Sequence, residues 1–166
     1  MTDQQLKAHL NAMKSGDKEA FSAVYSQLKT PVYTVLVRLT GDRTLSEDLL
    51  QEVFLKLYRQ PPRAEKPRAY VFRMARNLAI DALRQKQSTE PLEELPVRTD
   101  PDLKLDLERA FERLAVQERQ LVALHLSAGL TFREVAAIVE RPLGTVLWQY
   151  RKAIEKLRNL LDGGSL

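Results

Sequence analysis

The sequence contains no cysteine and only two histidines, His9 and His125. Without thiols the chain cannot form disulfides, thiolate zinc sites, iron–sulfur clusters or cysteine nucleophiles. The two histidines lie far apart and outside any metal-binding spacing, so we expect no metal site. The chain also lacks a Walker A motif, a dinucleotide-binding glycine motif and a GxSxG serine motif. We therefore expect no cofactor and no catalytic residue, which predicts a binding protein and not an enzyme.

Long apolar runs are missing as well. No stretch approaches the roughly 20 apolar residues that a membrane-spanning helix needs. The first residues lack the apolar segment of a signal peptide, so we expect a cytoplasmic protein without membrane insertion. Apolar residues nevertheless make up 44% of the 166 residues, enough for one medium domain or two small helical domains with a core.

Apolar residues recur at helical spacing along nearly the whole chain, and strand patterns are almost absent. In the N-terminal part, a short first helix precedes a second one that Asp17 is predicted to cap. Pro31 is predicted to begin the next helix, and Gly41 to end it. Thr44 and Glu47 have the spacing of a capping box for a further helix, which ends before two adjacent prolines. The pattern predicts an all-α fold.

A longer helix is predicted from Pro67 to about residue 86. It combines two aromatic residues, Tyr70 and Phe72, with several arginines. Aromatic faces beside basic groups suit single-stranded DNA, because bases stack on the rings while phosphates pair with the cations. The alternative is that one or both aromatic side chains belong to the core, and for Phe72 the two interpretations are equally weighted.

The segment that follows, over residues 88–100, is rich in proline and acidic residues and is predicted to be a linker. Asp100 and Pro101 are expected to begin a second helical domain. The strongest sequence signal of this second domain lies near its C-terminal end. Thr131 and Glu134 form a second capping box before a short helix, the segment RPLGT makes a tight break, and a last helix runs from about Thr145. This spacing predicts a helix-turn-helix, although an ordinary helical hairpin remains the alternative.

Charge is distributed unevenly. Residues 63–86 carry seven basic and two acidic side chains, and residues 91–110 carry three basic and six acidic ones. Two basic blocks around an acidic stretch suggest two DNA-facing domains and a linker, or simply solvated helix faces. A separate polar strip, Asp48, Gln51 and Glu52, lies on one helix face and is suited to docking another protein, with a solvated helix face as the alternative.

Together these segments resemble a known family. TLSEDLLQEVFLKLYR, followed by KPRAYVFRMARNLAIDALRQKQ, resembles region 2 of the extracytoplasmic-function (ECF) sigma factors of bacterial RNA polymerase. The segment from AFERL to KLRNLL, with GLTFREVA and PLGTV inside it, resembles their region 4. The resemblance extends over almost the whole chain, in the same order and spacing. It implies residues 1–87 as region 2, residues 88–100 as the linker and residues 101–166 as region 4.

The resemblance also implies partners and contact residues. Region 2 would dock on the β′ clamp helices of core RNA polymerase through Asp48, Leu49, Gln51, Glu52 and Phe54. It would capture the −10 element of promoter DNA through the loop of residues 60–66 and through Lys66, Arg68, Tyr70, Arg73, Arg76, Asn77 and Arg84. Region 4 would touch the β flap and bind the −35 element through Arg133, Thr145, Gln149, Arg151 and Lys152. A separate anti-sigma factor is the expected regulator.

Two features of the chain depart from the family pattern. Many relatives have tryptophan where this chain has Tyr70, and the last helix reads TVLWQYRK where a basic residue often follows the TV. The sequence leaves open whether Leu147 and Trp148 pack inward or contact DNA. Two other functions are considered: a stand-alone helix-turn-helix regulator that binds duplex DNA without polymerase, and a helical adapter. The absence of a dimerisation heptad disfavours the regulator.

Overall fold

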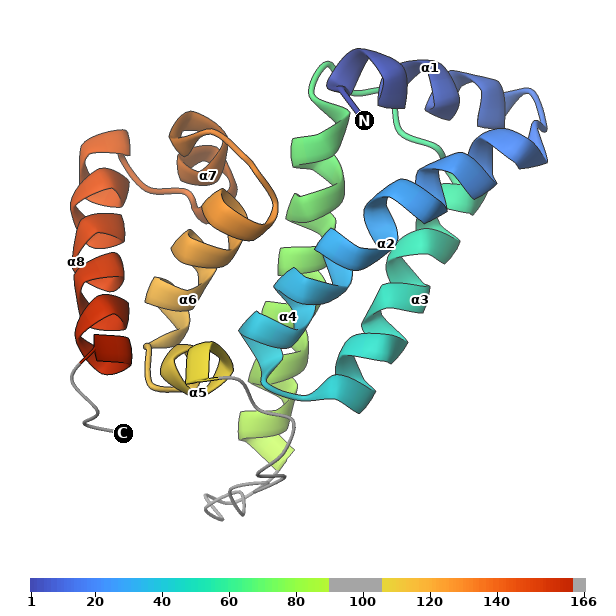
Figure 1. Ribbon diagram of the computed structural model, residues 1–166. Coiled ribbons are helices and arrows are strands. Elements are labelled where there is room, and N and C mark those ends of the chain that lie inside the picture. The colour runs from blue at the N-terminus through green and yellow to red at the C-terminus, as the bar shows by residue number, and fades with distance from the viewer. Residues whose placement is uncertain (90–105, 163–166) are drawn as a thin grey trace.

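The computed structural model describes residues 1–89 and 106–162, and within these ranges every regular element is a helix. Figure 1 shows α1–α4 gathered on one side of the molecule and α5–α8 on the other. We call these two groups the N-terminal half and the C-terminal half. The predicted all-α class is confirmed.

The N-terminal half consists of α1 (Asp3–Lys14), α2 (Lys18–Thr40), α3 (Arg43–Arg59) and α4 (Pro67–Thr89). Asp17 caps α2 as predicted, since its Oδ1 accepts from the backbone N–H of Glu19 and Ala20. Gly41 ends α2 in the left-handed conformation at φ 67°.

The predicted helix start at Pro31 is wrong, because α2 passes through this residue without a break. A proline inside a helix removes one hydrogen bond and costs about 3 kcal/mol. On either side of it, however, Val24, Leu28, Val32 and Val35 form one uninterrupted and fully buried stripe. Each such side chain contributes about 1.5–3 kcal/mol on burial, so the shared stripe outweighs the lost hydrogen bond.

The capping box predicted at Thr44 and Glu47 is also wrong. α3 begins one residue before Thr44, and its cap is Asp42, whose Oδ1 accepts from the N–H of Leu45 at 3.1 Å. Asp is at least as good an N-cap as Thr, and the turn made by Gly41 places Asp42 where the cap is needed.

The C-terminal half consists of α5 (Asp106–Glu112), α6 (Val116–Val122), η1 (Ala123–Ser127), α7 (Phe132–Val139) and α8 (Leu143–Asp162). The predicted box of Thr131 and Glu134 is confirmed by reciprocal hydrogen bonds of 3.1 and 3.0 Å. α8 begins two residues before the predicted Thr145. Most of the predicted linker and the predicted helix start at Asp100 lie outside the described residues.

The segment η1 is a π-helical continuation of α6, with a hydrogen bond from the N–H of Ala128 to the carbonyl of Ala123 at 3.0 Å. Gln120 to Leu124 are all buried, so this part of the helix is surrounded by other elements. Leu126, in contrast, is 59% exposed.

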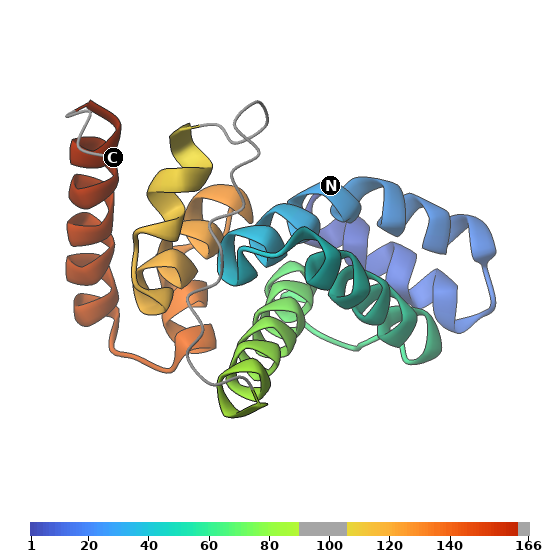
Figure 2. The ribbon, with the colours of Figure 1, turned by 90° about the horizontal axis from the view of Figure 1, so that it is seen from below.

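The two halves pack against each other. α2 lies along η1 and α6, and α4 lies against α7; Figure 2 shows the same neighbours from below. One cluster of buried apolar side chains runs from the N-terminal half into α6, η1 and α7, whereas a smaller cluster joins α5, α6 and α8.

Polar contacts accompany this apolar interface. Arg38 of α2 donates to the Oγ of Ser127, and its guanidinium lies 4.7 Å from the ring centroid of Phe111. At the rim, Arg43 Nη2 lies 3.6 Å from Glu108 Oε2. Burial lowers the pKa of Arg38, and the neighbouring Glu108 partly opposes that change. The structure is therefore closed, with the halves in direct contact.

Candidate nucleic-acid and protein interfaces

The polar strip on α3 is accessible. Asp48, Gln51 and Glu52 are exposed and share one face of the helix. Leu49 and Phe54, which the resemblance adds to this group, are only 7% and 3% exposed. They lie beneath the strip and support its position, and they do not form part of the accessible surface.

Two large apolar residues that the sequence analysis did not single out extend this face. Leu55 is 46% exposed and Tyr58 is 52% exposed. The ring of Tyr58 meets Phe21 of α2 edge-on at 5.1 Å between centroids. Leu55 lies three residues after Glu52, and Tyr58 lies three residues after Leu55, so this helical spacing is the signal that could have identified them. The α3 face therefore joins acidic and apolar groups, as protein-binding surfaces often do.

On α4, three candidate −10 arginines bridge to the C-terminal half. Arg68 Nε donates to the carbonyl of Ala128 at 2.8 Å, and Arg76 Nε donates to Gln120 Oε1 at 2.8 Å. Arg73, which is more exposed, donates from Nη2 to the carbonyl of Ala137 at 3.3 Å. These guanidinium groups are therefore not free in the closed structure.

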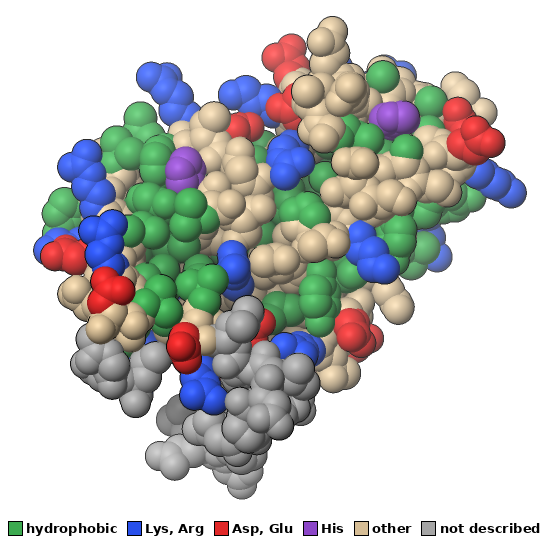
Figure 3. All heavy atoms as spheres, in the orientation of Figure 1, with side chains coloured by type: hydrophobic (Ala, Val, Ile, Leu, Met, Phe, Trp, Pro, Cys, Tyr) green, Lys and Arg blue, Asp and Glu red, His purple; other side chains and the backbone are tan. Residues whose placement is uncertain are grey.

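Arg76 is the most enclosed of the three. Burial lowers its pKa, and the nearby Arg84 acts in the same direction. Its acceptor, Gln120, is 4% exposed. Figure 3 shows Lys and Arg side chains along the middle of one face, where the two halves meet.

The two aromatic residues of α4 have different environments. Phe72 is fully buried in the core, whereas Tyr70 is 42% exposed. The structure thus decides the question that the sequence left open for Phe72. The remaining candidates of this group, Lys66, Asn77 and Arg84, are exposed. Tyr70 is the aromatic ring of this helix that is available for stacking.

The predicted helix-turn-helix is formed by α7 and α8. α7 ends at Val139, and its C-cap residue Glu140 adopts a left-handed conformation at φ 56°. The turn leads directly into α8, whose buried residues are Val146, Ala153 and Leu157. An aromatic group of His125, Phe132 and Tyr150 packs at the helix crossing, with the first two rings stacked at 3.9 Å. Burial raises the pKa of Tyr150.

The candidate −35 residues lie mostly in solvent. Arg133, Thr145, Arg151 and Lys152 are exposed. Gln149 is half-buried, and its Oε1 accepts from Arg141 Nη1 at 2.8 Å. This bond fixes the side-chain amide so that its NH₂ group remains available as a donor.

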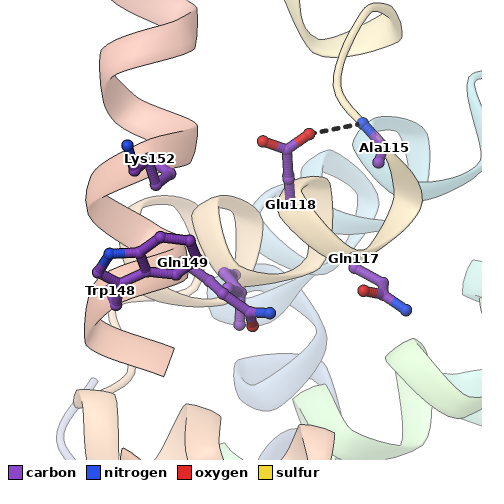
Figure 4. A pocket seen from close by; sticks show the side chains of 7 residues that line it. Ala115, Gln117, Glu118, Trp148, Gln149 and Lys152 are labelled. Atoms are coloured by element: carbon purple, nitrogen blue, oxygen red, sulfur yellow. Dashed lines mark hydrogen bonds between the residues drawn. The ribbon is translucent and has the colours of Figure 1, made fainter. Parts of the chain in front are cut away.

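The structure also resolves the orientation of Trp148. Its side chain is 62% exposed, whereas Leu147 is half-buried. Figure 4 shows the indole projecting from α8 at the edge of a hollow whose other side is the beginning of α6.

In residues 1–89 and 106–162, no group of three or more His, Cys, Asp or Glu side chains could hold a metal ion. None of the helices in those ranges is long and apolar enough to cross a bilayer.

Comparison with known proteins places these surfaces in a family context. Residues 24–89, which contain most of α2 and all of α3 and α4, match the family model of Sigma-70 region 2. The ECF RNA polymerase sigma factor SigK of Mycobacterium ulcerans (strain Agy99) is 29% identical over 175 residues, covering 95% of this chain and 94% of its own length. The chain thus contains a Sigma-70 region 2 segment and is similar to ECF RNA polymerase sigma factors along nearly its whole length. The ECF RNA polymerase sigma factor SigK of Mycobacterium tuberculosis (strain ATCC 25618 / H37Rv) is also 29% identical, over 95% of this chain and 94% of its own length.

Solved structures share the fold of this chain. CnrH, in complex with the cytosolic domain of CnrY, superposes with a TM-score of 0.71 at 19% identity, over 97% of this chain and 99% of that one. The sigma factor RpoE of Bartonella quintana, in complex with the anti-sigma factor NepR, gives 0.65 at 20% identity, over 85% and 96%. At this identity the likeness concerns the fold alone.

Proposed function

We propose that this chain is an initiation factor that binds core RNA polymerase, directs it to specific promoters and helps to open the −10 element. It works by binding and strand capture, without covalent chemistry, in the cytoplasm where the polymerase acts. The observation that carries the proposal is that one chain joins a Sigma-70 region 2 segment to a helix-turn-helix with an exposed second helix.

The proposed division of labour follows the predicted domains. Residues 1–87 act as region 2, residues 88–100 as the linker and residues 101–166 as region 4. α4 extends to Thr89, so the last helix of region 2 continues slightly beyond the predicted boundary.

The α3 face is the proposed contact with the β′ clamp helices. Asp48 and Glu52 supply exposed negative charge, and Gln51 supplies an amide between them. Leu55 and Tyr58 add apolar area at the same face. A protein partner with basic and apolar groups would complement this surface.

The α4 surface is the proposed holder of the −10 strand. Tyr70 offers a ring face for an unpaired base, and Arg68, Arg73 and Arg76 offer charge for phosphates. In the closed structure the same arginines donate to the C-terminal half. The strand and the C-terminal half therefore compete for these groups, and the halves must separate before the strand is captured.

The first half of α8 is proposed to enter the major groove of the −35 element, as second helices of such motifs do. Thr145, Gln149, Arg151 and Lys152 lie on this part of the helix, and Arg133 lies on α7. Region 4 is also proposed to touch the β flap.

An anti-sigma factor is the proposed regulator. Both solved neighbours were captured with a second protein, which for RpoE is the anti-sigma factor NepR. A partner of that class, holding the closed form of this chain, would keep the α4 arginines away from DNA.

The stand-alone regulator would bind duplex DNA without polymerase, as a symmetric dimer on palindromic half-sites. Similarity to the ECF RNA polymerase sigma factors argues against it, since the names of these relatives tie them to RNA polymerase. A stand-alone regulator would also leave the acidic and apolar α3 face without a role.

The deciding experiment is run-off transcription by core polymerase with and without this protein, on a pool of promoter fragments. Protein-dependent transcripts from defined start sites are expected. Absence of transcripts, together with no association with core polymerase, would refute the proposal. In the same assay Arg151→Ala and Lys152→Ala should weaken use of promoters that depend on the −35 element, whereas Arg158→Ala, in the second half of α8, should not.

A further inference from the structure

Trp148 has no packing role in the free protein. Tryptophan is highly buried on average, yet this side chain is 62% exposed, more than any other large apolar side chain in the described part of the chain. Stability does not explain its presence, because an exposed indole buries little apolar surface.

Its position on α8 is opposite to the core. Successive helix residues are about 100° apart, so Trp148 lies roughly 200° around the axis from the buried Val146. The same geometry places Arg151 and Lys152 about 60° and 40° to either side of Trp148. Lys152 Nζ lies 5.5 Å from the indole centroid, close enough to orient the ring.

The surroundings of the ring suit contact with DNA. The hollow beside the indole is lined by Ala115, Gln117, Glu118, Leu121, Gln149 and Lys152. Its one acidic group, Glu118, is occupied, since its Oε1 accepts from the N–H of Ala115 at 3.0 Å and lies 3.2 Å from Lys156 Nζ. Among the exposed residues next to Trp148 on α8, Arg151 and Lys152 are cations, which suit the phosphates on both sides of a groove.

We propose that Trp148 is a specificity residue of the −35 contact, and that its indole packs on the C5-methyl group of a thymine in the major groove. The thymine methyl is the apolar feature that distinguishes this base there. A flat, exposed and apolar side chain between two cations fits it, and Gln149 can contribute a donor beside it. This inference rests on the proposed function and deepens it, because it names one base feature that the second helix reads.

The test uses the holoenzyme and a promoter library randomised over the −35 element. We expect the wild-type protein to select thymine at one position, and Trp148→Ala to lose that selection while keeping the others. Replacing that thymine with deoxyuracil removes only the methyl group. It should weaken wild-type binding about fourfold, the effect of exposing one methyl-sized group, and should leave Trp148→Ala unchanged.

Leu126→Ala is the matched control, since Leu126 is similarly exposed at 59% but lies on η1. It should keep every base preference. Three results would overturn the assignment. The first is that Trp148→Ala keeps every base preference of the wild-type protein, and the second is that Trp148→Ala weakens binding equally to thymine and to deoxyuracil promoters. The third is that Trp148→Ala binds core polymerase more weakly but keeps its base preferences. If the wild-type protein itself starts no transcripts, the proposed function fails first, and that outcome is separate from these three.

Discussion

Tyr70 and Phe72 allow one helix to be tested for two different roles. They are two residues apart on α4, yet Tyr70 is 42% exposed and Phe72 is fully buried. Phe72→Ala should remove a core side chain and lower the free energy of unfolding by about 3–5 kcal/mol. Because domains of this size are stable by about 5–15 kcal/mol, much of the total would be lost.

Tyr70→Ala should behave in the opposite way. Surface substitutions usually change stability by less than about 0.5 kcal/mol, so its unfolding should match the wild-type protein. Loss of base stacking corresponds to about 1–3 kcal/mol per base, which predicts promoter opening weakened by about 5- to 160-fold. Tyr70→Phe keeps a ring of the same shape and should retain most of the activity.

Urea unfolding followed by circular dichroism measures the first effect, and permanganate reactivity of unpaired thymines in the holoenzyme–promoter complex measures the second. The assignment would be refuted if Tyr70→Ala opened promoters normally, or if Phe72→Ala were as stable as the wild-type protein. It would also fail if Tyr70→Phe and Tyr70→Ala lost opening equally.

Three further expectations concern other parts of the molecule. Reversing the charge of Asp48 and Glu52 to Lys should weaken binding to core polymerase more than tenfold in a pull-down titration, while the circular dichroism spectrum is unchanged. Arg43→Cys with Glu108→Cys, joined by a cleavable bismaleimide, should hold the halves closed and stop transcription until the spacer is cut. Glu140→Gly should raise the free energy of unfolding by about 1 kcal/mol, since glycine tolerates the left-handed backbone that this residue adopts.

Each of these has a clear contrary result. Normal co-purification of the charge-reversed protein would remove the α3 face from the polymerase contact, and Asp162→Lys at the end of α8 serves as its control. Full transcription by the cross-linked protein would show that the halves need not separate. Because the chain has no native cysteine, each single-cysteine variant controls for the label alone. Lower stability of Glu140→Gly would mean that the Glu side chain contributes more than its backbone strain costs.

The helices could be predicted because their apolar residues repeat with the helical period, and the caps Asp17 and Thr131 confirm this reasoning in detail. The predicted helix start at Pro31 fails because the local signal of a proline does not include the buried stripe of α2 that continues past it. The predicted capping box at Thr44 fails because Asp42 is an equally suitable N-cap. Asp42 comes directly after the turn at Gly41, so α3 begins there.

The candidate sites were only partly predictable. A helical pattern shows that Tyr70 and Phe72 point in different directions, but it does not show which direction is the core. The contact between the halves has no sequence signature at all, since Arg68 and Arg73 donate to backbone carbonyls, which every residue possesses. Trp148 could be placed only when the buried face of α8 was known.

The neutral acceptors of the α4 arginines have a consequence for the influence of ionic strength. A backbone carbonyl or the Gln120 amide carries no net charge, so closing the halves neutralises no phosphates and releases no condensed counterions. The proposed binding of the same arginines to DNA would release them, and the affinity would then fall steeply as salt rises. Added salt therefore weakens the DNA-bound state far more than the closed state. A higher salt concentration should therefore raise the fraction of this protein that is in the closed form.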